Sequence, residues 1–236
     1  MSNQLSAQLP ILHPSTILVA GPTGSGKTEF LVKLLTQKAI FPYPQRIIWV
    51  YSEWQNAYER IRREVAKGRS VEFIKEFSEE LYESLDRKVR NLVVLDDQME
   101  NRDMHRNGGT GLSKYFTQGS HHRNLTVIYI VQNLFHKTDA MRTISINSNY
   151  LILFKNPRDT LQIQTLATQM YGSNSHFLVK AFTNATKNVP YSHVLIDLRP
   201  ETPDELRVRS NVFDIEKQCI YVPRDTKPEL VFKVHR

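Results

Sequence analysis

The sequence predicts an α/β fold in which a mainly parallel central sheet is flanked by helices. Five short apolar runs have the pattern of strands buried inside a parallel sheet. The first run leads into a glycine-rich turn and then an amphipathic segment, an order typical of nucleotide-binding α/β domains. The five runs cover residues 16–20, 46–51, 91–97, 125–131 and 150–154.

Five segments between or after these runs are expected to be mostly helical, because apolar residues recur there at helical spacing. Asn156-Pro157 supplies an N-cap and a first-turn proline for one of these helices, and Gly172 closes it. A further strand is expected near 193–198. The expected helical segments are 27–38, 54–89, 112–122, 157–171 and 175–183.

The turn after the first run has the spacing G-x-x-x-x-G-K-[ST] of a P-loop, or Walker A motif. Glycines at this spacing let backbone N–H groups turn inward around phosphates, and the next helix directs its N-terminal dipole at them. Lys27 is expected to reach the β- and γ-phosphates, and the Thr28 hydroxyl to ligate Mg²⁺. The motif predicts that ATP binds to eight residues: Gly21, Pro22, Thr23, Gly24, Ser25, Gly26, Lys27 and Thr28.

The run 91–97, Asn-Leu-Val-Val-Leu-Asp-Asp, ends in two carboxylates and is interpreted as a Walker B motif. A parallel strand delivers its C-terminal residues to the nucleotide edge of the sheet, so Asp96 is expected to hold Mg²⁺ through water. Asp97 follows where a carboxylate can orient or deprotonate the attacking water. The alternative is a strand that merely ends in polar residues, and the short Asp97 side chain leaves its reach to water open.

Gln132 ends the run 125–131. In ATPases that insert a strand between the Walker A and Walker B strands, a polar residue at the end of that strand hydrogen-bonds the γ-phosphate or the attacking water. Gln132 is therefore a candidate γ-phosphate sensor. An ordinary polar strand end is the alternative.

The formal net charge of +7 and the pI of about 9.4 favour a polyanionic partner such as nucleic acid, although charge alone does not decide this. A polar, glycine-rich loop at 98–111, together with Lys114, and a basic cluster at 60–69 are candidates for contacting phosphates. Exposed segments without a ligand are the alternative for both. The basic residues are Arg102, His105 and Arg106 in the loop and Arg60, Arg62, Arg63, Lys67 and Arg69 in the cluster.

The length of 236 residues suits one large α/β domain with extensions and is short for a two-domain helicase. We expect an N-terminal arm at 1–14, a P-loop ATPase domain at 15–199, and a C-terminal extension at 200–236 packed on or beside the core. No apolar run is long enough to span a bilayer, and no signal-peptide pattern begins the sequence. We therefore expect a cytosolic or nuclear protein that is neither secreted nor membrane-bound. Cys219, the single cysteine, is expected to pack in an apolar strand.

Segments 21–28, 95–97, 119–135 and 153–159 together resemble viral genome-packaging ATPases of the FtsK–HerA superfamily. The resemblance is closest to those of Polinton/Maverick elements and adintoviruses, with poxvirus packaging ATPases as more distant relatives, and extends over about 14–222. It implies a RecA-like P-loop NTPase of the ASCE type. Such a protein forms a homo-oligomeric ring, a hexamer or pentamer, and hydrolyses Mg-ATP at subunit interfaces to move double-stranded DNA into a capsid.

The resemblance also implies partners, a place in the cell and a further catalytic residue. The partners are double-stranded DNA and capsid vertex proteins, at sites of virion assembly in the host nucleus or cytoplasm, or in the virion. The residue is an arginine that enters a neighbouring subunit's site and stabilises charge on the γ-phosphate. Many relatives have an arginine at the position of His121, so this sequence departs from the pattern. Arg123 is the first candidate for this arginine, and Arg142 and Arg158 are its competitors.

Two other functions share the P-loop. A kinase of a small molecule or nucleoside would turn over ATP without DNA and phosphorylate a metabolite. A non-hydrolysing module would use bound ATP as an assembly clamp and show no turnover. A GTPase is disfavoured because the sequence contains no [NT]-K-x-D guanine motif.

Overall fold

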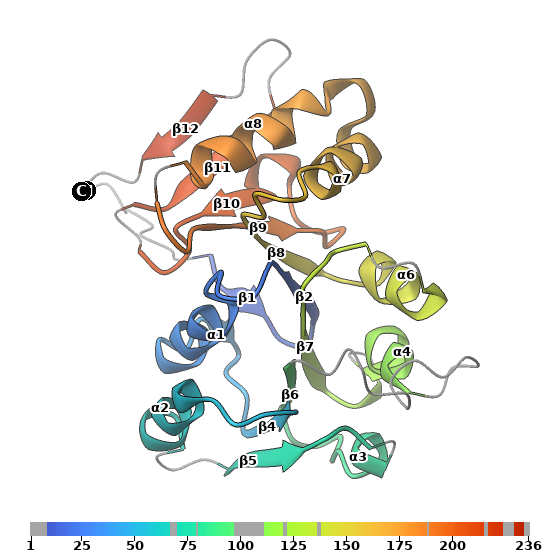
Figure 1. The fold of residues 1–236 in the computed structure, drawn as a ribbon. Helices are drawn as coiled ribbons and strands as arrows, with labels where there is room; N and C mark the ends of the chain where they lie inside the picture. Colours follow the sequence, from blue (N-terminus) through green and yellow to red (C-terminus); the bar gives the residue numbers. More distant parts are fainter. Residues whose placement is uncertain are drawn as a thin grey trace, which may run out of the picture.

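The computed structural model describes residues 9–66, 70–78, 80–96, 111–119, 122–135, 138–187, 189–214, 217–223 and 229–233. Within these residues, the centre is a ten-stranded sheet with helices on both faces (Figure 1). Six neighbouring strands run parallel, in the order β8 (Tyr150–Phe154), β2 (Thr16–Ala20), β7 (Leu125–Val131), β6 (Asn91–Asp96), β4 (Arg46–Tyr51) and β5 (Ser70–Lys75). Four strands continue the sheet beyond β8 in antiparallel pairing, in the order β9 (His193–Asp197), β10 (Val208–Ser210), β11 (Cys219–Val222) and β12 (Glu229–Lys233). The fold class predicted from the sequence is confirmed.

The four central parallel strands, β2, β6, β7 and β8, are mostly apolar because both faces of the sheet are buried there. Successive side chains of a strand point to opposite faces, so β2 contributes to two separate cores. Leu18 belongs to one core, whereas Ile17 and Val19 belong to the other. All five apolar runs identified in the sequence form strands of this parallel half.

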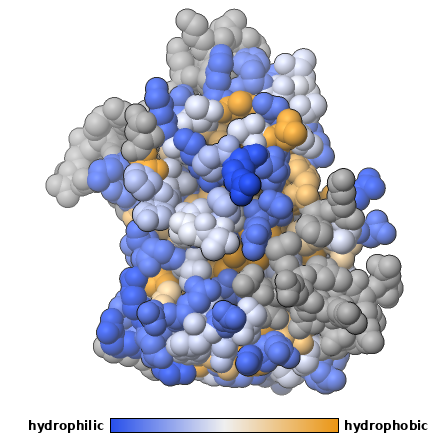
Figure 2. Space-filling view, in the orientation of Figure 1, coloured by the Kyte–Doolittle hydropathy of each residue, from blue (hydrophilic) through white to orange (hydrophobic). Residues whose placement is uncertain are grey.

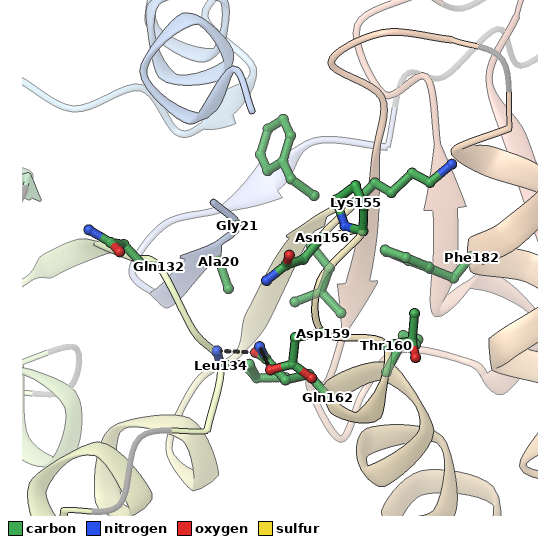
Figure 3. Close-up of a pocket in the computed structure, with 14 residues that line it drawn as sticks. Ala20, Gly21, Gln132, Leu134, Lys155, Asn156, Asp159, Thr160, Gln162 and Phe182 are labelled. Carbon is green, nitrogen blue, oxygen red and sulfur yellow. Dashed lines mark hydrogen bonds between the residues drawn. The ribbon is translucent and has the colours of Figure 1, made fainter. Parts of the chain in front are cut away.

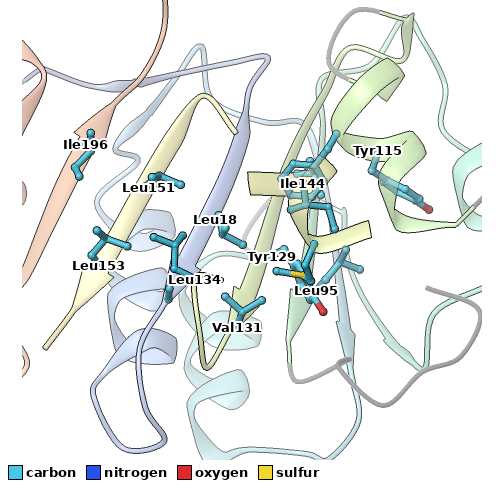
Figure 4. Close-up of a cluster of buried hydrophobic side chains, with 14 of the residues drawn as sticks. Leu18, Leu95, Tyr115, Tyr129, Val131, Leu134, Ile144, Leu151, Leu153 and Ile196 are labelled. Atoms are coloured by element: carbon cyan, nitrogen blue, oxygen red, sulfur yellow. The ribbon is translucent and has the colours of Figure 1, made fainter. Parts of the chain in front are cut away.

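Helices cover the two faces and complete the two cores. On the face of Ile17 and Val19 lie α1 (Lys27–Thr36) and α2 (Asn56–Glu64). Figure 4 shows part of the opposite core, where Leu18, Tyr129 and Leu95 come from β2, β7 and β6. The elements over that face are α3 (Glu80–Glu83), α4 (Leu112–Lys114) with the π-helical turn Tyr115–Gly119, α6 (Asp139–Ile146), α7 (Leu161–Tyr171) and α8 (His176–Ala185).

Three local features differ from the expectations. Helix α7 begins at Leu161 after the N-cap Thr160, so Asn156-Pro157 does not start it. The interval 54–89 is not mostly helical, because β5 pairs in parallel with β4 along its whole length. Val71 and Phe73 pack on the α2 side of the sheet while Ile74 packs on the other, which is strand alternation. Helix α6 was not expected, and its N-cap Thr138 accepts a hydrogen bond from the backbone N–H of Met141.

The first described residues are fastened to the domain rather than projecting from it. The short strands β1 (Ile11–Leu12) and β3 (Ile40–Phe41) pair in parallel, and the Ile11 side chain is buried. The backbone N–H of Leu12 donates to the Tyr150 hydroxyl at 3.0 Å. Residues 9–12 of the expected arm therefore pack against the domain.

The face of the molecule turned to the viewer in Figure 1 is largely hydrophilic, and its apolar residues form separate small patches (Figure 2). Among the described residues, no helix combines the length and apolarity needed to cross a membrane.

His193, the first residue of β9, lies in an aromatic cluster beside α1. Its ring centroid is 4.6 Å from that of Phe30, 5.3 Å from Phe154 and 6.0 Å from Phe213. Burial lowers the pKa of His193 to about 4, and a hydrogen bond with the backbone of Tyr191 offsets this only in part. An exposed histidine in the unfolded chain has a pKa of about 6.5, so the unfolded chain binds more protons between these two values.

We expect the free energy of unfolding to decrease as the pH falls from 6.5 to 4, with about 3 kcal/mol of the decrease due to His193. Urea denaturation at a series of pH values measures this slope. The variant His193→Phe keeps an aromatic ring but cannot be protonated, so its slope should be shallower. An unchanged slope would assign the loss to other groups such as His13, whose pKa is also lowered by burial.

Candidate functional site

The P-loop connects β2 to α1 at the carboxyl edge of the parallel strands, and its glycines meet two different requirements. Gly24 and Gly26 have φ angles of 76° and 98°, in the left-handed region that side chains disfavour. Gly21 has no space for a side chain, because a Cβ there would lie 2.6 Å from Phe154 Cβ and 2.8 Å from Ser25 Oγ. The glycine spacing of the motif therefore follows from backbone conformation at two positions and close packing at the third.

Lys27 is the first residue of α1, and its side chain folds back over the loop. Its Nζ donates to the carbonyl oxygen of Gly21 at 2.6 Å and to that of Pro22 at 2.9 Å. The ammonium group is thereby held within the ring of backbone that a P-loop wraps around phosphates. Its position fits the predicted contact with the β- and γ-phosphates.

A pocket of about 320 Å³ lies over the P-loop, where the ends of β6 and β7 meet the start of α1. It brings together four side chains predicted from the sequence: Lys27, Thr28, Asp96 and Gln132. Two further polar residues that the sequence did not predict line the pocket, Gln55 after β4 and Glu29 in α1. No motif marks Gln55, which reaches the pocket because β4 ends at the same sheet edge.

The strand order explains how Asp96 and Gln132 reach one pocket. Strand β7 lies between the Walker A strand β2 and the Walker B strand β6, and all three are parallel. Their carboxyl ends therefore meet at one edge, with Gln132 directly after the central strand. This is the inserted-strand order that made Gln132 a candidate sensor.

Asp96 is buried, and the Tyr58 hydroxyl donates a hydrogen bond to its Oδ2 at 2.8 Å. Tyr58 belongs to α2 and is enclosed by Trp49, Tyr51 and Trp54, with ring centroids 5.2 to 5.8 Å away. This aromatic packing fixes the hydroxyl and so orients the carboxylate. Nothing in the sequence spacing relates Tyr58 to Asp96, because tertiary packing alone creates the contact.

Oxygen donors are what Mg²⁺ requires, and the Thr28 hydroxyl and the Asp96 carboxylate supply them in this pocket. The residue set therefore fits a bound Mg²⁺ ion. Asp97 lies outside the described residues, as do His121 and the expected phosphate-contact residues Arg102, His105 and Arg106.

Gln132 also lines a smaller, largely apolar pocket of about 120 Å³ beside the start of α7 (Figure 3). Beside that pocket, the Gln162 side chain joins the loop after β7 to α7. Its Oε1 accepts from the backbone N–H of Leu134 at 2.6 Å, while its Nε2 donates to Asn133 Oδ1 at 3.2 Å and Asp159 Oδ2 at 2.6 Å. The loop that follows Gln132 is thereby hydrogen-bonded to the first turn of α7.

The structure does not bring Arg123 to the P-loop of its own chain. Arg123 precedes β7 and therefore lies at the amino end of the strand, opposite the P-loop edge. Its side chain is 13% exposed, forms an ion pair with Glu83, and stacks over the Tyr82 ring. Lys114 pairs with the same Glu83 at 2.7 Å.

The two competing arginines have different surroundings. Arg142 is exposed on α6, whereas Arg158 is exposed just after β8, at the P-loop edge.

The described arginines of the basic cluster are paired with carboxylates. Arg60 contacts Glu29 at 2.7 Å, and Arg62 contacts Glu59 at 3.4 Å while lying over the Trp54 ring. Arg63 contacts Glu64. These ion pairs favour an exposed helix face over a phosphate-binding patch; Lys67 and Arg69 lie outside the described residues.

No family model matches the sequence, and no curated protein does. Solved structures match its fold. The genome packaging NTPase B204 from Sulfolobus turreted icosahedral virus 2, in complex with AMPPCP, aligns with 80% of this chain and 94% of its own at 14% identity, with a TM-score of 0.55. B204, the DNA-packaging ATPase from Sulfolobus turreted icosahedral virus, aligns over 80% and 94% at 11% identity, with a TM-score of 0.53.

A third structure, EssC (ATPases 2 and 3) from Geobacillus thermodenitrificans, aligns with 91% of this chain and 41% of its own at 13% identity, with a TM-score of 0.52. The chain has the P-loop NTPase fold. At these identities the likeness establishes the fold, and the chemistry is argued from the residues of the pocket.

The hydroxyl of Tyr58 gives a first prediction about this pocket. The variant Tyr58→Phe keeps the packed ring but removes the donor that orients Asp96. We expect the Mg²⁺ concentration needed for half-maximal ATP binding to rise by about 10-fold, since hydrogen bonds to metal-site carboxylates tune affinity on this scale. This concentration is measured by titrating Mg²⁺ while the binding of a fluorescent ATP analogue is followed. Tyr51→Phe, from the same aromatic cluster, is the control. An unchanged Mg²⁺ requirement would limit Tyr58 to a packing role.

Proposed function

We propose that this protein is an ATPase that uses hydrolysis to translocate double-stranded DNA and package a viral or virus-like genome into a capsid. The observation that carries the proposal is the meeting of the P-loop, Asp96 and Gln132 in one pocket, on a sheet with β7 inserted between β2 and β6. The likeness of the fold to B204, a genome packaging NTPase, supports the packaging role.

The residues of the pocket divide the work of phosphoryl transfer. Backbone N–H groups of the P-loop and the Lys27 ammonium bind the β- and γ-phosphates, and Thr28 with Asp96 holds the metal. Mg²⁺, when bound, neutralises charge that develops on the phosphates. Asp97 orients the attacking water or removes its proton. Gln132 contacts the γ-phosphate and so distinguishes ATP from ADP.

A motor must convert loss of the γ-phosphate into movement, and the Gln162 hydrogen bonds offer a route. Gln132 and Leu134 belong to one short loop, and Gln162 fastens that loop to the first turn of α7. A change at Gln132 after hydrolysis would therefore move α7. Such movement of a subunit within a ring would pull on bound DNA.

The proposed ring would give Arg123 a role that it cannot have within its own chain. An arginine at the amino edge of the sheet cannot reach the P-loop at the carboxyl edge of the same chain. In a head-to-tail interface, two copies contact each other through different surfaces. When this interface repeats around a ring, the arginine of one subunit can enter the site of the next. We assign Arg123 this role in a hexamer or pentamer, with capsid vertex proteins as partners at sites of virion assembly in the nucleus or cytoplasm.

Steady-state ATP hydrolysis with and without long double-stranded DNA tests the proposal, together with sedimentation to follow assembly. We expect DNA to stimulate turnover and ring-sized oligomers to form. The Lys27→Ala variant should lose turnover by about 100-fold or more, because it removes a cation that stabilises transition-state charge. An ATP turnover rate that is unchanged by DNA, together with a phosphorylated metabolite as product, would instead indicate a kinase. ATP binding without turnover would indicate an assembly clamp.

The Arg123 assignment is tested by Arg123→Lys, which retains the positive charge beside Glu83 but lacks the guanidinium fork. We expect DNA-stimulated hydrolysis to fall by about 1000-fold while ATP binding and assembly are unchanged. Mixing Arg123→Lys subunits with Lys27→Ala subunits should restore part of the activity, since some interfaces then combine an intact P-loop with an intact arginine. Normal activity of Arg123→Lys would move the assignment to Arg142 or Arg158, tested by the same exchange.

A further inference from the structure

A second pocket, of about 590 Å³, adjoins the P-loop and is larger than the pocket that holds Lys27 and Asp96. It lies between the loop residues Gly24 and Ser25 and the segment 189–192 that precedes β9, with Lys155 and Thr186 also in its lining. Of all these residues, only Gly24 also lines the pocket that holds Lys27 and Asp96. A ligand whose phosphates occupy the first pocket can therefore extend past Gly24 into the second.

This second pocket carries two large apolar side chains that are left exposed. Tyr191 is 71% exposed and Val189 is 56% exposed, directly beside a loop built for phosphates. Tyr191 lies close against the loop, because its Cβ, Cγ and Cδ1 atoms are 3.1 to 3.4 Å from the position that a Cβ would take at Gly26. The aromatic ring thus packs against the P-loop backbone while remaining exposed to solvent.

The segment that carries Tyr191 is held in an unfavourable conformation. Tyr191 has a φ of 60°, which is uncommon for a bulky residue and usually taken by glycine or asparagine. A 2.7 Å hydrogen bond from Ser192 Oγ to the carbonyl oxygen of Val189 closes the segment around it. An aromatic side chain is therefore placed beside the loop at a cost in backbone energy.

We propose that Tyr191 and Val189 form the subsite for the nucleobase of the bound nucleotide, an inference that rests on the proposed binding of ATP by the P-loop. A nucleobase is flat and apolar on its faces, and aromatic side chains bind it by stacking. The hydroxyls of Thr186 and Ser192 already donate to backbone carbonyl oxygens. We therefore expect stacking on the Tyr191 ring to be the main contact with the base, while the phosphates are held at Lys27.

Calorimetry with Mg-ATP and with Mg-tripolyphosphate distinguishes the contribution of the base to the affinity from that of the phosphates. The wild-type protein should bind ATP about 10-fold or more tighter than tripolyphosphate, as expected for one stacked base. Tyr191→Asn removes the ring with a residue that tolerates the left-handed backbone, and should weaken ATP by about 10-fold while leaving tripolyphosphate unchanged. Tyr191→Phe retains the ring and should bind both ligands normally. Phe41→Ser, which removes a 64% exposed ring from β3, is the matched control.

The outcomes distinguish failure of the subsite from failure of the proposed function. If tripolyphosphate binds and ATP binds no tighter, or if Tyr191→Asn binds ATP as the wild type does, the subsite is overturned and the P-loop function stands. If neither ligand binds the wild-type protein, the proposed function is overturned, and the subsite with it. Equal weakening of both ligands by Tyr191→Asn would show damage to the loop and would also overturn the subsite.

Discussion

Burial of both faces of the parallel sheet is the constraint on which the rest of the structure depends. Strands β2, β6 and β7 are buried on both faces, so their polar side chains can reach solvent or a ligand only at the strand ends. Because the strands are parallel, those ends meet at one edge, where backbone groups no longer have strand partners. The P-loop, Asp96 and Gln132 lie together for this reason. The chemistry of the pocket is thus a consequence of strand direction rather than of any single motif.

The same packing controls the orientation of the site. Asp96 is a buried carboxylate, and such a group is costly unless it is hydrogen-bonded. Tyr58 provides the bond, and Tyr58 is itself fixed by the aromatic rings of β4 and the segment after it. A helix that covers the outer part of the sheet therefore determines the direction of the Walker B carboxylate. On the opposite face of the sheet, Gln162 of α7 plays a comparable role for the loop that follows Gln132.

The sequence predicted those features that depend on local pattern. The five apolar strands and the P-loop follow from β-branched runs and glycine spacing, and each is present in the structure. Strand β5 was missed because Ile74, Phe77 and Leu81 recur at a spacing typical of one helix. In the structure these three residues lie in a strand, a turn and a short helix, and the pairing of β5 with β4 favours this arrangement. The contact of Tyr58 with Asp96 and the exposed ring of Tyr191 could not be predicted, since both depend on segments distant in sequence.

The surroundings of Arg123 bear on how a ring could be switched. Arg123 and Lys114 share the carboxylate of Glu83, and these two cations lower the Glu83 pKa. Glu83 is exposed, and water and salt weaken such an ion pair, so the contact does not prevent Arg123 from exchanging partners. Under the proposed assembly, the γ-phosphate of a neighbouring subunit would carry more charge than one carboxylate. In the ring that we propose, the arginine would be held on Glu83 in the free chain and transferred when a nucleotide-loaded neighbour docks, and hydrolysis would then depend on assembly.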